Sequence, residues 1–274
     1  MKILFHLGHP AHFHLFKNTI LNLTQQGHKT SIIIKKKDIL EELLINEGLK
    51  YKNILPEGRK NSKISIAIGL LKQDFQILKY CLKYKPNLLV GTSVPICHVG
   101  KFLGIPSINL NEDDASVVPL YSKLAYPFAD IILSPTCCNN MKWDKKTIKY
   151  PGFHELAYLH PNNFKPNIKV CEKYIDTKEP FFILRFSSLN AHHDKGVKGI
   201  NDKIALKLIE IIKPHGKVLI TSERPLNSLL EKYRIKINPL DMHNFLAFAK
   251  MYIGDSQTMA AEAGVLGTPF IRFN

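Results

Sequence analysis

Short apolar runs alternate with longer amphipathic stretches along the first half of the chain. Apolar residues at helical spacing predict helices that end at Gly27 and Gly48, and a long helix over Lys63–Tyr84. Strands that alternate with helices are typical of βαβ units, so this half is predicted to form a mostly parallel sheet. The runs with the length and composition of buried strands are Lys2–Leu7, Thr30–Ile34, Asn87–Val90, Ser107–Leu110 and Asp130–Leu133.

The same alternation begins again after residue 166, and it predicts a second parallel α/β unit. The strands predicted there are Phe181–Arg185, Lys217–Thr221, Ile235–Ile237, Met251–Gly254 and Pro269–Phe273. The helices predicted between them are Asn201–Ile212, Leu226–Tyr233, Met242–Ala249 and Met259–Leu266.

Proline and glycine interrupt the pattern between the two halves, at Tyr150-Pro151-Gly152 and at Pro161 and Pro166. We therefore expect an α/β chain with two Rossmann-like parallel-sheet domains: residues 1–150, a linker over 151–166, and residues 167–274. The sequence stops on the last predicted strand, whereas parallel sheets are normally covered by helices on both faces. The second domain is thus expected to be truncated and to lack its C-terminal helices.

The composition is that of an ordinary globular protein, with 45% hydrophobic and 22% charged residues among 274. No apolar run approaches the roughly 18–20 residues of a membrane span, and the start of the chain lacks the features of a secretory signal. Five cysteines without C-x-x-C spacing exclude a disulfide framework and a structural zinc site. These features together predict a cytoplasmic protein.

The charge is less ordinary, because 38 Lys+Arg against 23 Asp+Glu give +15. Residues 1–150 carry +10 (21 basic, 11 acidic) and residues 151–274 carry +5 (17 basic, 12 acidic). Such an excess favours nucleic acid, an anionic membrane surface or phosphate-bearing substrates as partners. No basic motif interleaved with aromatics is present, so nucleic acid is not expected. A peripheral contact with the inner face of an anionic membrane, near Lys35–Lys37, remains an expectation.

Ligands of open α/β sheets bind beyond the carboxyl ends of the strands, which directs attention to the loop from Gly8 to His14. Gly8 permits a close approach of a ligand, and the helix that follows offers free amides to an anion. His9 and His12 are candidates for a general base or a phosphate ligand, or are simply polar residues at a helix start. The loop has neither a dinucleotide fingerprint nor a Walker motif. No carboxylate or cysteine shares the histidine spacing, so no metal site is predicted.

A second candidate loop, Asn111-Glu112-Asp113-Asp114, follows another predicted strand. Its carboxylates could supply a general base or hold a cation, or they form a solvated loop with a capping aspartate. Glu112 is the candidate base. Gly91-Thr92-Ser93 is a weaker candidate, because these residues are also common in turns.

Three loops of the second half have residues suited to phosphate and ribose. Arg185 ends a strand and is followed by hydroxyl groups, as expected of a diphosphate clamp, although an arginine–carboxylate pair is the alternative. Ser256 and Thr258 can cap a helix whose amides face a phosphate, and Glu262 could bind a ribose diol. The full set of candidate nucleotide-binding residues is Gly8, Arg185, Ser187, Ser222, Glu223, Ser256, Gln257, Thr258 and Glu262.

The run GDSQTMAAEAGVLGTP resembles a segment of sugar-nucleotide enzymes with two Rossmann-like domains, the GT-B-like fold. UDP-N-acetylglucosamine 2-epimerases and the lipid-linked N-acetylglucosaminyltransferase of peptidoglycan synthesis share this architecture. Together with GHPAHFHLFKN, YPGFHELAYLHP and RFSSLNAHHDKG, it is more closely similar to a prokaryotic family of this fold described as a domain of unknown function.

The resemblance implies an acceptor-binding N-terminal domain, a nucleotide-binding C-terminal domain and catalysis between them. It places Gly8 and His9 in the first loop, Glu112 in a polar loop after the fifth strand, and Glu262 on the ribose. The chain departs from the pattern in its Gly-His-Pro loop, in Gly-Asp-Ser-Gln-Thr where a Ser-Gly-Gly turn is typical, and in the missing C-terminal helices.

We therefore expect a glycosyltransferase-like enzyme that acts on a nucleoside-diphosphate sugar, a UDP-sugar, in cell-surface glycan synthesis. The nucleotide sugar would be the substrate, no cofactor is expected, and the acceptor would be a glycan or a lipid-linked molecule. Three alternatives remain: a nucleotide-sugar 2-epimerase-like isomerase, because fold alone does not fix chemistry, a non-catalytic binding protein, or a truncated remnant.

Overall fold

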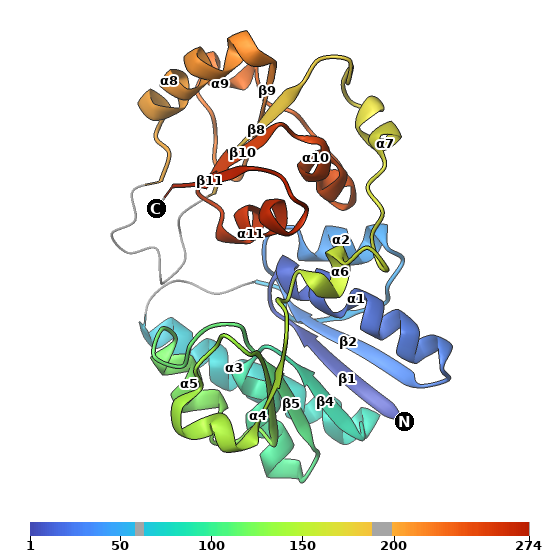
Figure 1. Ribbon diagram of the computed structural model, residues 1–274. Coiled ribbons are helices and arrows are strands. Elements are labelled where there is room, and N and C mark those ends of the chain that lie inside the picture. Colours follow the sequence, from blue (N-terminus) through green and yellow to red (C-terminus); the bar gives the residue numbers. More distant parts are fainter. Residues whose placement is uncertain (58–62, 188–198, 274) are drawn as a thin grey trace. The chain divides into compact units, whose positions relative to one another are not determined.

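The computed structural model describes residues 1–57, 63–187 and 199–273 of the chain (Figure 1). It divides into two compact units, Met1–Tyr158 and Leu159–Asn274, which we call the first and the second unit. The division lies within the segment 151–166 that the sequence marks as a linker. That segment is not wholly irregular, because it contains one turn of helix, α6 (Leu156–Leu159).

A seven-stranded parallel sheet, in the order β3-β2-β1-β4-β5-β6-β7, forms the centre of the first unit. The strand order reverses between β1 and β4, so the helices that follow these two strands cover opposite faces of the sheet. Figure 1 shows β1, β2, β4 and β5 side by side. The strands are β1 (Lys2–Leu7), β2 (Lys29–Lys35), β3 (Lys52–Leu55), β4 (Leu88–Gly91), β5 (Ser107–Leu110), β6 (Ile131–Pro135) and β7 (Thr147–Tyr150).

Helices cover both faces of this sheet. α1 packs with α2, while α3 packs with α4 and α4 with α5; Figure 1 shows these two groups on opposite sides of the strands. Leu4, Leu89 and Ile132 of the strands are fully buried, with Ile77 of α3 and Ile96 of α4 in the same cluster. The helices are α1 (Pro10–Gln25), α2 (Leu40–Asn46), α3 (Lys63–Tyr84), α4 (Val94–Leu103), α5 (Pro119–Ala125) and the 3-10 helix η1 (Met141–Lys146).

The second unit has a four-stranded parallel sheet in the order β11-β10-β8-β9. One hydrophobic cluster joins β8 and β10 to α10 and α11, and another joins β8 and β9 to α8 and α9. The strands are β8 (Phe181–Phe186), β9 (Lys217–Ser222), β10 (Met251–Gly254) and β11 (Phe270–Arg272). The helices are α7 (Ile168–Glu172), α8 (Asp202–Ile212), η3 (Lys213–His215), α9 (Ser228–Glu231), η4 (Pro239–Asp241), α10 (Met242–Phe248) and α11 (Gln257–Val265).

One predicted strand is wrong. Residues Ile235–Ile237 do not form a strand; an isolated parallel bridge pairs Ile220 of β9 with Arg234, and the amide of Ile235 donates to the carbonyl of Ile220 at 3.0 Å. The apolar alternation that suggested a strand has another cause, because Ile235 and Ile237 are half-buried against the core beside α10. The strands β3 and β7 were not predicted; each has four residues and lies at an edge of the sheet.

No helix in the described parts of the chain is long and apolar enough to cross a membrane. All five cysteines are free thiols. Burial raises the pKa of Cys81 and of Cys97 to about 12, so both side chains stay protonated and serve as small apolar residues of the first core.

Gly91 ends β4 at a point where the backbone of β1 leaves no room for a side chain. A Cβ atom on Gly91 would lie 2.7 Å from the carbonyl oxygen of His6, its partner in the parallel register. We predict that Gly91→Ala lowers the free energy of unfolding by about 1–3 kcal/mol, because the two central strands must separate. Urea unfolding followed by the fluorescence of Trp143, the single tryptophan, measures this loss in the first unit.

Gly8→Ala is the matched control for this prediction. A Cβ atom on Gly8 would meet the Cε atom of Lys35 at 3.0 Å, which is part of a flexible side chain rather than backbone. The control is therefore expected to destabilise the first unit less than Gly91→Ala. Equal losses for the two variants would contradict the close strand approach at Gly91.

Candidate functional site

Two turns meet at the point where the strand order of the first unit reverses. The Nδ1 atom of His6, on β1, lies 2.6 Å from the hydroxyl of Ser93, which follows β4. The hydroxyl of Thr92 lies 2.6 Å from Nε2 of His12 on α1, and the amide of Gly8 donates to Nδ1 of His12 at 3.1 Å. These contacts tie the β1–α1 turn to the β4–α4 turn.

His9 begins the helix that follows. Its Nδ1 atom accepts a hydrogen bond from the amide of Ala11 at 3.2 Å, and Pro10 occupies the first helical position. His9 is therefore the N-cap of α1, which is the role that the sequence allowed as polar helix-start chemistry. A role for His9 as a base or a phosphate ligand stays a prediction.

Burial keeps two of these histidines neutral. Burial, together with the charge of Lys35, lowers the pKa of His6 to about 3. The pKa of His12 is also well below its ordinary value, through burial and then through the charges of His9 and Lys35. A general base works best with a pKa near the pH of the reaction. This environment therefore makes His12 a weak base, and the prediction that it acts as the base gains no support.

A further histidine, which is not among the site residues predicted from the sequence, lies beside the predicted base Glu112. Nδ1 of His154 lies 3.2 Å from Oε2 of Glu112, and the His154 ring is nearly parallel to that of Tyr150, at 13°. The charge of His154 is also the smallest of the effects that lower the pKa of His12. We call the four side chains His12, Glu112, Tyr150 and His154 the histidine cluster. A signal was present, because His154 lies in YPGFHELAYLHP, one of the runs that carry the family resemblance.

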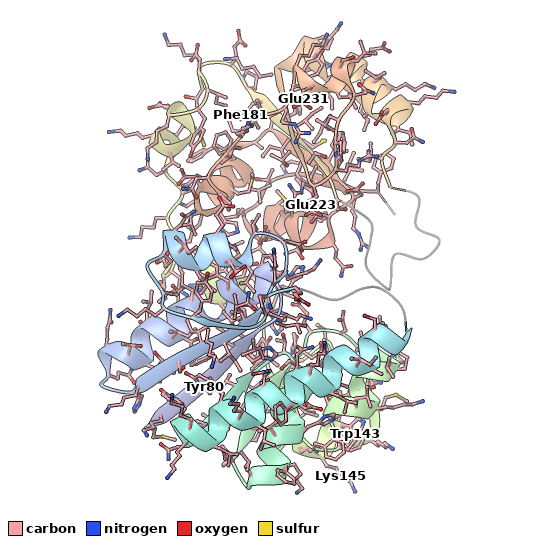
Figure 2. The ribbon with its side chains drawn as sticks, turned by 180° about the vertical axis from the view of Figure 1, so that it is seen from behind. Tyr80, Trp143, Lys145, Phe181, Glu223 and Glu231 are labelled. Atoms are coloured by element: carbon pink, nitrogen blue, oxygen red, sulfur yellow. The ribbon has the colours of Figure 1, made fainter. Side chains whose placement is uncertain are left out.

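In the second unit, the predicted phosphate-binding residues lie at the carboxyl edge of the sheet. Figure 2 labels Phe181, where β8 begins, and Glu223, beyond the end of β9, at opposite ends of this sheet. Arg185 pairs in register with Gly254, the last residue of β10, and its Nη2 atom lies 2.5 Å from Oε1 of Glu223. The arginine–carboxylate pair that the sequence left open is thus present.

Asp255 organises this edge and was missed as a site residue. Its Oδ1 atom accepts hydrogen bonds from the amide of Ser187 at 2.6 Å and from the Ser187 hydroxyl at 2.7 Å. Its Oδ2 atom accepts from the amide of Ile200 at 3.2 Å. The hydroxyl of Ser187 therefore donates to Asp255 in this structure. The loop residues from Ser188 to Asp194 lie outside the described residues.

The hydroxyl of Ser222 also serves a local turn, since it donates to the carbonyl of Arg224 at 2.8 Å and accepts from the Arg224 amide at 3.1 Å. The Arg224 guanidinium lies over the ring of Phe186, 5.2 Å from its centroid. Ser222 thus shapes the turn that carries Glu223, and a direct contact of Ser222 with a nucleotide stays a prediction.

Ser256 is the N-cap of α11, as the sequence predicts, and accepts from the amide of Met259 at 3.4 Å. Gln257 and Thr258 form the first turn of this helix. Glu262 is buried on the second turn, with Oε1 3.1 Å from Nε2 of His243 on α10. His243 lies 19 residues away in sequence, so its pairing with Glu262 could not be read from either local motif.

No three histidine, cysteine, aspartate or glutamate side chains in the described residues lie close enough to hold a metal ion.

The buried imidazole of His6 predicts a loss of stability in acid. The unfolded chain binds a proton on His6 below pH 6.5, whereas the folded chain does so only near pH 3. The free energy of unfolding is thus expected to fall as the pH falls between these values, by about 1.4 kcal/mol per pH unit from His6. In urea titrations at pH 4 to 6, His6→Asn should reduce the slope of the free energy of unfolding against pH by this amount. His28→Asn is the control for the replacement of a histidine and should leave the contribution of His6 in place. An unchanged slope in His6→Asn would show that His6 is protonated in the folded state.

Solved structures of other proteins are similar to this fold over nearly the whole chain. The structure of UDP-GlcNAc 2-epimerase from Neisseria meningitidis bound to UDP-GlcNAc is similar over 99% of this chain and 82% of that chain, with 15% identity and a TM-score of 0.72. The enzyme of the same name from Methanocaldococcus jannaschii, in complex with UDP-GlcNAc and UDP, is similar over 99% and 83%, with 17% identity and a TM-score of 0.71. Spinosyn rhamnosyltransferase SpnG matches over 99% and 80%, with 14% identity and a TM-score of 0.64.

These similarities confirm the predicted α/β class with two parallel-sheet units and a GT-B-like fold. The search of curated proteins gives no match. A family model described as "Protein of unknown function (DUF354)" matches residues 1–273. With nearly its whole length matched by this model, the chain belongs to the DUF354 family.

Proposed function

We propose that the chain is an enzyme that acts on a nucleoside-diphosphate sugar, specifically a UDP-sugar, and that the second unit holds the nucleotide. The observation that carries this proposal is the position of Arg185 beside the start of α11 at the carboxyl edge of the sheet. A guanidinium and a helix N-terminus together supply the fixed donors that a diphosphate requires.

Arg185 can exchange its present partner, the carboxylate of Glu223, for a phosphate group. Its carboxylate partner, Glu223, has a side chain that is 37% exposed, so water can replace this contact at small loss. The Nε atom of Arg185 is buried and has no hydrogen-bond partner among the described residues. A diphosphate oxygen would satisfy this donor and take the place of Glu223 on the guanidinium.

Glu262 is proposed to bind the ribose. Its carboxylate lies on the second turn of α11, one turn beyond the proposed phosphate donors, and is oriented by His243. A carboxylate accepts hydrogen bonds from two neighbouring hydroxyls, which suits a ribose diol. The similar structures solved with UDP-GlcNAc or UDP support a uridine nucleotide as the ligand.

The proposed reaction is transfer of the sugar to a glycan or lipid-linked acceptor in cell-surface glycan synthesis. The histidine cluster of the first unit would supply the proton transfer that activates an acceptor hydroxyl. The nucleotide sugar is the substrate, and the proposal involves no cofactor.

Epimerisation at C2 of the sugar is the second candidate. The histidine cluster favours it, because inversion at a carbon requires removal and return of a proton by positioned acid–base groups. Two of the three similar structures described above are UDP-GlcNAc 2-epimerases. Transfer uses an acceptor and releases UDP, whereas epimerisation needs no acceptor.

Calorimetric titration of the full chain with UDP tests the nucleotide site. We predict saturable binding that Arg185→Ala weakens by about tenfold or more, because charged hydrogen bonds to the diphosphate are lost. Glu223→Gln should not weaken binding, since it removes the competing carboxylate. Lys236→Ala, which removes one exposed positive charge of the same unit, is the matched control. Absence of UDP binding at millimolar concentration by the folded chain would refute the proposal.

Product analysis separates the two candidate reactions. The chain is incubated with UDP-N-acetylglucosamine alone, and the sugar nucleotide is analysed by nuclear magnetic resonance. Inversion at C2 without release of UDP is the outcome expected of an epimerase. Release of UDP only after addition of an acceptor extract is the outcome expected of a transferase.

A further inference from the structure

The His154 ring is held between a carboxylate and an aromatic ring at the carboxyl edge of the first sheet. Glu112 follows β5, Tyr150 ends β7, and His154 comes four residues later. Nδ1 of His154 lies 3.2 Å from Oε2 of Glu112, and the plane of the ring makes an angle of 13° with that of Tyr150. With its side chain 11% exposed, His154 has little freedom to turn.

The two nitrogens of this ring differ in their surroundings. Nδ1 faces a carboxylate, which favours a proton on Nδ1 whether the ring is neutral or charged. Nε2 is buried and, among the described residues, has no hydrogen-bond partner; the same holds for the hydroxyl of Tyr150. Buried polar atoms without partners are rare in folded proteins because they destabilise them, so their presence here requires an explanation.

We infer that His154, rather than Glu112, is the group of the first unit that takes up and returns a proton, and that Glu112 acts through His154 as a positioning residue. The inference rests on the proposed function and names the acid–base residue of that site. In the step, an O–H or C–H bond of the substrate breaks, its electron pair stays on the substrate atom, and an N–H bond forms at Nε2. The imidazolium that results faces the carboxylate of Glu112.

The surrounding titratable groups are compatible with this role. They are Glu112 after β5, Tyr150 on β7, Glu155 beside His154, and His12 on α1. His12 is neutral near pH 7, because burial lowers its pKa, and so it does not repel a charged His154. Burial and the charge of Glu112 raise the pKa of Tyr150, which therefore stays a neutral phenol. Glu112 is then the charge closest to the ring among the contacts described above.

Nitrogen magnetic resonance of the full chain, labelled with 15N-histidine, tests the inference. The His154 signals are assigned by their loss in His154→Gln and, should that variant not fold, by their displacement in Tyr150→Phe. We predict that neutral His154 carries its proton on Nδ1, and that Glu112→Ala allows the proton to move to Nε2, because the facing acceptor is lost. Glu42→Ala, which replaces an exposed glutamate of the same unit, is the matched control and should leave the His154 signals unchanged.

A neutral ring with its proton on Nε2 in the unaltered chain, or the same tautomer in Glu112→Ala as in the unaltered chain, would overturn the inference. The Glu112 side chain is 44% exposed, so its replacement by alanine is expected to leave the fold intact. Titration with UDP on the same samples distinguishes the two proposals. Loss of UDP binding refutes the proposed function and leaves the magnetic resonance result standing. If UDP binds but replacement of Glu112 leaves the His154 signals unchanged, only this inference is refuted.

Discussion

The first unit depends on the close approach of β1 and β4, the two strands between which the strand order reverses. Gly91 makes this approach possible, because any side chain there would collide with the backbone of His6. The same approach brings Ser93 to His6 and Thr92 to His12. The geometry of the two turns is therefore a consequence of strand packing, and the buried, neutral state of both imidazoles follows from it.

Much of the fold could be predicted from the sequence, because strongly apolar strands and long amphipathic helices have clear patterns. The strand at Lys2–Leu7 and the helix at Lys63–Tyr84 have the predicted bounds. The strand at Ile235–Ile237 was predicted wrongly because alternating apolar residues show only that alternate side chains are buried. An irregular segment packed against the core, as this one is beside α10, has the same alternation as a strand. The strand Thr147–Tyr150 has only one strongly apolar residue, Ile148, and its place at the sheet edge depends on pairing with β6.

The sequence indicates which loops carry the candidate residues, but it does not indicate which side chains pair with one another. Loops after strands identified Arg185, Glu112 and Ser256, since parallel strands place their carboxyl ends at one edge. The partners come from distant segments: Glu223 for Arg185, His154 for Glu112. Tertiary packing brings these pairs together, and no local pattern in the sequence shows which distant residues will meet. The same is true of Glu262, whose carboxylate is oriented by a histidine of another helix.

Asp255 binds the chain on both sides of the segment 188–198, through Ser187 before it and Ile200 after it. One carboxylate thus holds two points of the backbone that are separate in sequence. Loss of this carboxylate would leave the amides of Ser187 and Ile200 without their acceptor at the same time, and a buried amide without an acceptor destabilises a fold.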